Sequence, residues 1–184
     1  MTPDPAPRRD PLLTAARLLL MAFIGVIGVA AAAIVLAIPL VIAFQNRALA
    51  EIAKKGVETG PEIIGAIALV LAGVAVLLAM AIWFLVLLRR IVLSVGEGDP
   101  FVPINASRLS QMGWAVLAGQ LVSIPVGRAV LWIATIVADK DDHVHVGDDF
   151  GFTSSSLLLM LVLFILARVF RRGAAMREEL EGTV

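Results

Sequence analysis

The chain has 184 residues, of which 60% are hydrophobic, and its 15 basic residues balance 15 acidic ones. A soluble domain of this length does not need so much apolar surface, so we expect a membrane protein without an independent soluble domain. The balanced charge gives no expectation of direct nucleic-acid binding. The absence of cysteine excludes a disulfide framework and thiolate chemistry.

Four long apolar runs follow one another along the chain. Residues 18–44 and 63–88 hold no charge, 109–138 hold only Arg128, and 150–167 form the shortest run. Because about 20 helical residues cross a hydrocarbon core, the runs predict four membrane spans. The first run is far longer than a secretory signal of about 7–15 apolar residues, so we expect it to be retained. The predicted spans cover 18–44, 63–88, 111–138 and 153–170.

Positive charge gathers on one side of these spans. Ten Lys or Arg residues flank the spans on the side of both termini and the loop at 89–110, against four on the side of the loops at 45–62 and 139–152. An excess of Lys and Arg marks the cytoplasmic side. The predicted fold is therefore an all-α integral membrane protein. It forms one domain, 1–184, with four antiparallel transmembrane helices in a bundle and both termini cytoplasmic, in the bacterial cytoplasmic (inner) membrane.

Small residues recur at helical spacing in the first two spans. Such residues let helix backbones approach closely in lipid. We expect them to pack helices within the bundle, and the alternative is a seam in a homo-oligomer. The first span has Ala22, Gly25, Gly28 and Ala32, and the second has Gly65, Ala68, Ala72, Ala75 and Ala79.

The third span carries the polar residues. Gln120 lies midway between two glycines at seven-residue spacing, and Ser123 and Arg128 follow it. A charge within a span is costly and usually faces protein or water. We expect a structural role for Arg128, in which it reaches the outer interface or pairs with Glu62. The alternative is a binding site or polar path formed by Gln120, Ser123 and Arg128.

The loop at 89–110 contains signals that end one helix and start another. The second span should continue as helix to about Val95 and end in the glycines that follow. Asp99 before Pro100 disfavours helix. Asn105 is expected to cap the helix that enters the third span, and Phe101 should dock on the helix ends or on the lipid surface.

Two segments carry a resemblance to a known family. The loop sequence Gly98-Asp99-Pro100-Phe101, followed by Asn105, Arg108-Leu109 and Gly113-Trp114, resembles the hallmark loop of a small bacterial membrane family, domain-of-unknown-function family 2975. The C-terminal segment 166–184 and the four-span arrangement are similar to the same family. The resemblance implies a helix-turn-helix regulator encoded nearby as one candidate partner. It carries over no catalytic residue, because the family has no established reaction.

The loop at 139–152 holds both histidines of the chain. In an extended strand His143 and His145 would face the same way, beside several aspartates. Imidazoles bind zinc, copper and nickel, but metal sites usually need three or four ligands. We expect a solvated acidic loop, with metal binding or pH sensing as the alternatives. In the other outer loop, the segment 47–55 predicts either a short amphipathic helix or a prolongation of the first span.

The functional expectation rests on the absence of a catalytic group of residues from the loops. The acids and bases lie on opposite sides of the membrane, so we expect no enzymatic activity and no cofactor. The leading hypothesis is an accessory or regulatory membrane protein that acts through protein contacts, with the inner face as its working surface. Arginines and glutamates after the fourth span should anchor its helix, which should end near Gly182, or serve as a docking surface. A small transporter or channel is the second hypothesis.

Overall fold

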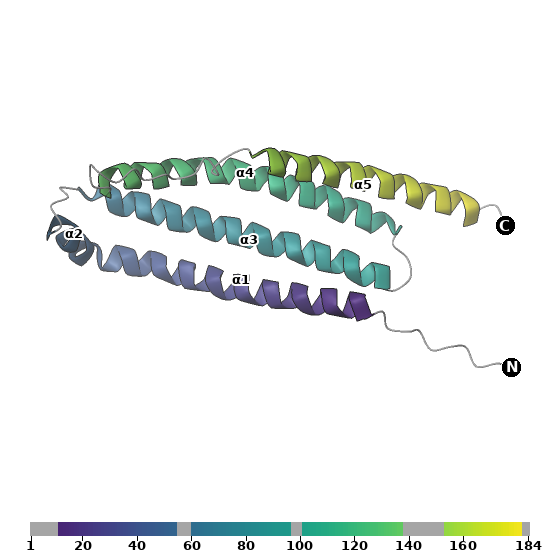
Figure 1. Cartoon of the computed structure of the whole chain (residues 1–184), viewed down its shortest axis with the longest axis horizontal. Coiled ribbons are helices and arrows are strands. Elements are labelled where there is room, and N and C mark those ends of the chain that lie inside the picture. The colour runs from purple at the N-terminus through teal and green to yellow at the C-terminus, as the bar shows by residue number, and fades with distance from the viewer. Residues whose placement is uncertain (1–10, 55–59, 97–100, 138–152, 182–184) are drawn as a thin grey trace.

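The computed structural model describes residues 11–54, 60–96, 101–137 and 153–181. These residues form five α-helices and no strand, which confirms the all-α prediction. The helices are α1 (Pro11–Ala43), α2 (Gln45–Lys54), α3 (Glu62–Gly96), α4 (Pro103–Val137) and α5 (Ser154–Glu181) (Figure 1).

Four of the described helices, all except α2, are long and apolar enough to cross a membrane, which confirms the four predicted spans. Each is longer than its apolar run, because it continues into the charged flank. The predicted continuation of two helices past their apolar runs is confirmed too, since α3 reaches Gly96 and α5 reaches Glu181. Helices α1 and α4 continue through Pro39 and Pro125.

The short helix α2 settles the two readings of the segment after the first span. A turn at Phe44 separates α2 from α1, and the amide of Ala48 donates to the Phe44 carbonyl to start the new helix (3.0 Å). The guanidinium of Arg47 lies 5.6 Å from the centre of the Phe44 ring. Leu49 and Ile52 are half-buried. The segment is therefore a separate amphipathic helix.

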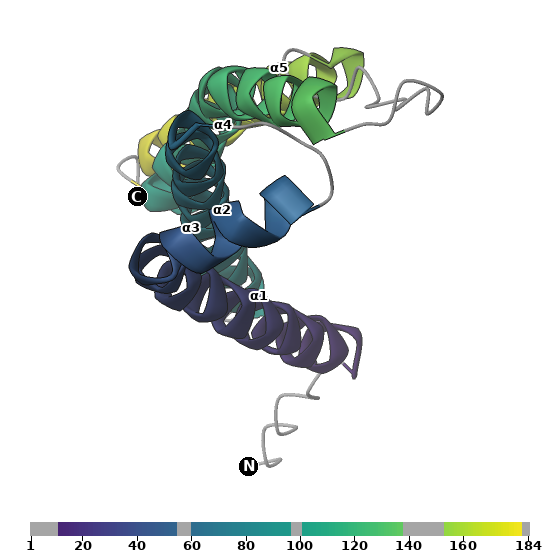
Figure 2. The same cartoon turned by 90° about the vertical axis from the view of Figure 1, so that its left-hand side faces the viewer.

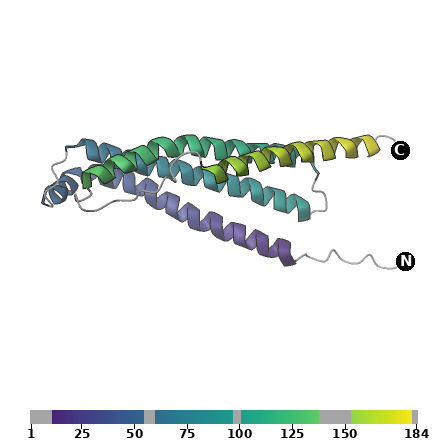
Figure 3. The ribbon, with the colours of Figure 1, turned by 45° about the horizontal axis from the view of Figure 1, so that its top comes forward.

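The long helices form an open row. Helix α1 packs against α3, α3 against α4, and α4 against α5. Seen from the end, the row is curved, with α1 and α5 at its two edges (Figure 2). Helices α3, α4 and α5 lie together, while α1 lies to one side (Figure 3). The start of α1, the end of α3, the start of α4 and the end of α5 all lie at the same end of the molecule (Figure 1).

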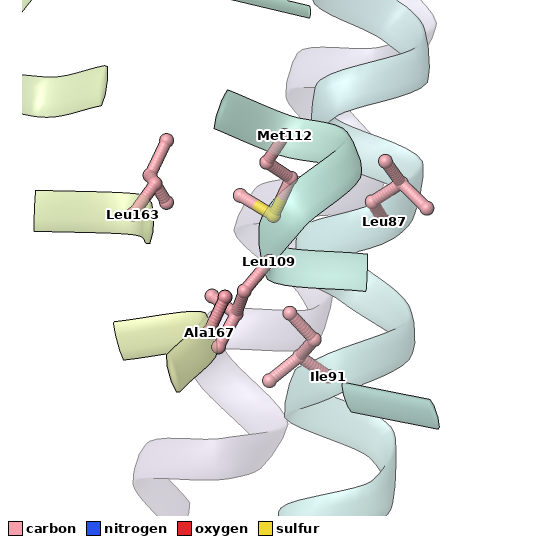
Figure 4. Close-up of a cluster of buried hydrophobic side chains, with 6 residues drawn as sticks. All are labelled: Leu87, Ile91, Leu109, Met112, Leu163 and Ala167. Carbon is pink, nitrogen blue, oxygen red and sulfur yellow. The ribbon is translucent and has the colours of Figure 1, made fainter. Parts of the chain in front are cut away.

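The buried core belongs to three of the four long helices. Two residues each from α3, α4 and α5 form one apolar cluster (Figure 4). In contrast, α1 has no buried residue. Helix α1 is therefore a peripheral helix on a three-helix core. The cluster comprises Leu87, Ile91, Leu109, Met112, Leu163 and Ala167.

The small residues make fewer helix contacts than expected. A Cβ built at Gly25 or Gly28 of α1 would meet nothing within 4 Å, and the same holds for Gly65 of α3. The prediction that these stripes pack helices within one copy is therefore wrong at these three glycines. Close approach occurs elsewhere, where Gly73 faces Val126 of α4.

Candidate functional site

The predicted site residues fall into separate places on the molecule. Phe101, Asn105 and Arg108 lie together where α3 ends and α4 begins, whereas Gln120 and Ser123 lie near the middle of α4. Three other residues of the predicted loop motif and the two histidines lie outside the described residues. They are Gly98, Asp99, Pro100, His143 and His145.

Asn105 is the centre of a buried hydrogen-bond network. The residue is 0% exposed, and its Nδ2 donates to Ser94 Oγ (2.7 Å) across the α3–α4 contact. Ser94 Oγ in turn donates to the Ile91 carbonyl (2.8 Å). The predicted N-cap role of Asn105 is wrong, because α4 begins two residues earlier, at Pro103. Proline is favoured at a first helical position, where its missing N–H would have been unpaired.

The same network fixes the Arg108 guanidinium through one of its nitrogens, Nη1. Arg108 Nη1 donates to Asn105 Oδ1 (2.9 Å) and to the carbonyl of Arg90 (3.2 Å). These bonds join the start of α4 to the last turns of α3. The side chain is thus fixed before any ligand arrives, which favours an oriented contact over a mobile surface charge.

Phe101 fastens the start of α4 to α5. Its ring lies 5.3 Å from the ring of Phe170, tilted by 40°. A Cβ at Gly173 would lie 2.6 Å from Phe101 Cδ1, so the ring rests directly on that glycine. Phe101 therefore docks on protein, but against the side of α5 and not on a helix end. The contact brings the loop motif and the C-terminal segment side by side.

Eight described arginines gather at this same end, which we call the arginine end. Arg17 and Arg89 each bury an Nε atom that has no hydrogen-bond partner among the described residues. These two donors therefore have no acceptor in the part of the chain that the structure describes. The eight are Arg17, Arg89, Arg90, Arg108, Arg168, Arg171, Arg172 and Arg177.

The polar residues in the middle of α4 are used in a helix contact. Gln120 Nε2 donates to Ser156 Oγ on the first turn of α5 (2.7 Å), and Ser156 shares a further hydrogen bond with Thr153. Ser123 Oγ donates to the carbonyl of Gln120 (2.8 Å). These side chains join α4 to the start of α5 and do not form a continuous polar path along α4.

Arg128 is exposed and lies away from this cluster. The predicted pairing with Glu62 is wrong, since the described residues place no ion pair between them. Arg128 and Arg108 lie 20 positions apart on α4, a rise of about 30 Å, which matches the thickness of a hydrocarbon core. This spacing agrees with the other predicted role, in which Arg128 reaches the interface opposite the arginine end.

Comparison with known families decides the relationship that the loop suggested. The model of the family described as Protein of unknown function (DUF2975) matches residues 48–184, well over half of the chain. The chain belongs to this family. It matches no curated protein and no solved structure. The matched part of this DUF2975 member contains α3, α4 and α5, and with them the buried core and the Asn105 network, whereas all of α1 precedes it.

Two site residues escaped the sequence analysis of this DUF2975 member. Ser94 is the only polar residue in the apolar stretch 91–95 beyond the second span, and that isolation was the available signal. Ser156 belongs to a run of four hydroxyl residues, 153–156, in which no single position stands out by sequence. Neither partner could be assigned, because Asn105 and Gln120 lie on another helix.

Replacing Gln120 by leucine should lower the free energy of unfolding by only about 0.5–1 kcal/mol, because interhelical hydrogen bonds within membranes average about 0.6 kcal/mol. Unfolding in mixed micelles with increasing sodium dodecyl sulfate, followed by circular dichroism, measures the change. Gln111→Leu, at an exposed glutamine of the same helix, is the matched control. A loss above about 2 kcal/mol at Gln120 alone would contradict a single interhelical bond.

Proposed function

We propose that the protein is a non-enzymatic accessory or regulatory protein of the bacterial cytoplasmic membrane, with the arginine end in the cytoplasm, that acts by binding another membrane protein. The open row of helices carries this proposal. A closed bundle would cover its inward faces with its own helices, whereas here the main contact of α1 with the other described long helices is with α3, and α1 buries no residue.

The concave side of the row forms an apolar groove of about 640 Å³. Its walls come from all four long helices, including Phe23 and Ile27 of α1, Phe84 of α3 and Leu159 of α5. Polar groups are few, with Gln120 and Ser123 on α4. An apolar groove with a small number of polar groups suits a partner helix, which would pack by shape and by one or two hydrogen bonds.

Transport receives less support from the same residues. A path along α4 would need polar side chains that face a common channel, yet Gln120 is bonded to α5 and Arg128 is exposed. The regulator implied by the family resemblance remains a candidate partner at the arginine end. Metal or pH sensing through His143 and His145 stays a prediction, because both lie outside the described residues.

A photo-crosslinking amino acid at Ile27 should capture the partner, while the same amino acid at Val29 should capture only lipid. Residues two positions apart on a helix point about 200° apart around the helix axis and differ in depth along it by about 3 Å. Ile27 lines the groove and Val29 is 73% exposed, so the two positions differ mainly in direction. The measurement is mass spectrometry of the crosslinked products from intact cells.

A genetic control should show that the protein crosslinked at Ile27 is the functional partner. Deleting the gene of the captured protein should abolish the adduct and reproduce the phenotype of deleting this protein. Lipid adducts alone at both positions would refute the proposed function. So would an equal yield of one protein adduct at Ile27 and Val29, because the groove would then have no preference.

A further inference from the structure

A second, smaller cavity of about 290 Å³ lies at the arginine end, between the last turns of α3 and the start of α4. It shares no residue with the groove. Two arginines and one serine line it, together with three apolar residues. The lining residues are Arg90, Leu93, Ser94, Val102, Ile104 and Arg108.

The charge in this cavity is uncompensated by the described residues. Neither Arg90 nor Arg108 forms an ion pair with a described carboxylate. Two like charges beside one cavity repel each other, and an anion between them would remove that repulsion. The cavity therefore favours a negatively charged ligand.

The hydrogen bonds of Arg108 define the shape of that ligand. A guanidinium has five N–H donors, of which Nη1 carries two. Both Nη1 donors are directed at protein, to Asn105 Oδ1 and to the carbonyl of Arg90. Among the described residues no acceptor meets the edge formed by Nε and Nη2. That edge presents two parallel donors, the arrangement that binds two oxygens of one phosphate.

The depth of the cavity matches a phospholipid headgroup. Arg90 lies two residues beyond the apolar run that ends at Leu88, and Arg108 lies about 30 Å along α4 from Arg128. Phosphates lie just outside a hydrocarbon core of about this thickness. Val76 and Trp83 precede Arg90 at seven-residue spacing, so they share its face of α3, and they are 47% and 48% exposed. This stripe offers an apolar surface for an acyl chain below the arginines.

We propose that the cavity binds the phosphate of an anionic phospholipid, whose acyl chain lies along Val76 and Trp83. Arg108 would hold the phosphate through its Nε–Nη2 edge, and Arg90 would add the second positive charge. A zwitterionic lipid offers the same phosphate but brings a cation toward two arginines, so it should bind less well. The lipid would bridge α3 and α4 at the end that carries the loop motif.

The test uses quenching of Trp83 by brominated lipids. Replacing Trp114 and Trp132 by phenylalanine leaves Trp83 as the one tryptophan of the chain. This protein is placed in vesicles that contain brominated phosphatidylglycerol or brominated phosphatidylcholine at equal mole fraction. We expect a relative binding constant about five- to ten-fold in favour of phosphatidylglycerol. Arg90→Gln should reduce the preference to about two-fold or less.

Two further variants separate a site from general surface charge. Arg172→Gln makes the same charge change at an exposed arginine of α5 that does not line the cavity, and it should leave the preference intact. Arg108→Lys keeps the charge but loses the two-donor edge, so it should weaken the preference while circular dichroism shows unchanged helix content. An equal loss in Arg172→Gln, or no loss in Arg90→Gln and Arg108→Lys, would overturn the proposal.

Competition with inorganic phosphate shows whether the bound phosphate belongs to a lipid headgroup or to a soluble anion. Added to the vesicles at about ten times the concentration of accessible lipid, it should not relieve the quenching, because it lacks the acyl chain that the stripe would bind. Relief of quenching by inorganic phosphate that disappears in Arg108→Lys would assign the cavity to a soluble phosphate and overturn the lipid assignment.

Discussion

Gly113→Leu should destabilise the protein by about 2–3 kcal/mol, because it forces α4 and α5 apart. Gly113 is buried, and a Cβ there would lie 3.0 Å from Cε1 and Cζ of Phe164. Phe164 cannot easily yield, since its ring also contacts Trp114 edge to face at 5.7 Å. Gly113→Ala should cost less, about 1 kcal/mol, because one carbon needs a shift of only a few tenths of an ångström.

Gly25→Leu on α1 is the matched control for this prediction. Both substitutions gain the same helix propensity over glycine, about 0.5–1 kcal/mol, but a Cβ at Gly25 meets nothing within 4 Å. Unfolding by sodium dodecyl sulfate in mixed micelles measures both. Equal stability of the two variants would contradict close packing at Gly113. A loss at Gly25 that depends on protein concentration would instead place the α1 stripe between two copies.

The long helices were predictable because lipid imposes a simple rule on the sequence. Every backbone polar group within a bilayer must be bonded internally, so a long apolar run has to be helical. The sequence also predicted that α3 continues past its apolar run, as it does to Gly96. The start of α4 was predicted less well, because Asn105 was taken as a cap although Pro103 already provides a first helical residue.

The arrangement of the helices was not predictable from the same pattern. In a soluble bundle the apolar face of each helix identifies the side that packs, but a helix in lipid is apolar on every side. Small residues were therefore the available signal, and they misled at Gly25 and Gly28. Their stripe on α1 faces open space, while the buried core lies among α3, α4 and α5.

The candidate site shows the same division. Polarity within a span singled out Gln120, since such groups need partners, whereas Asn105 was predicted as a helix cap and Arg108 was noted through the family resemblance. The partners themselves, Ser94 and Ser156, depend on the register between helices. A sequence without its packing does not contain that register. Thus the residues of the site could be predicted, whereas their partners could not.

Asn105→Ala should lower the free energy of unfolding by about 2–3 kcal/mol, because the hydrogen bonds to Ser94 and Arg108 are lost and their buried polar groups are left behind. The side chain is fully buried and joins Ser94 of α3 to Arg108 of α4. Its removal deprives the Arg108 guanidinium of one acceptor, and hydrogen bonds to charged groups are the stronger ones. Ser107→Ala, at an exposed position on the same turn, should change stability by less than about 0.5 kcal/mol.

A double-mutant cycle with Ser94→Ala isolates the bond that crosses the α3–α4 contact. If Asn105 acts through Ser94, the double variant should lose about 1 kcal/mol less than the sum of the single losses. Additive losses would show that Asn105 stabilises the protein by filling space and not by bonding Ser94.

The Asn105 variant also connects stability to the proposed lipid site, because Asn105 accepts a hydrogen bond from the Arg108 guanidinium and so holds its orientation. Asn105→Ala should therefore weaken the preference of the Trp83 protein for phosphatidylglycerol, whereas Ser107→Ala should leave it unchanged.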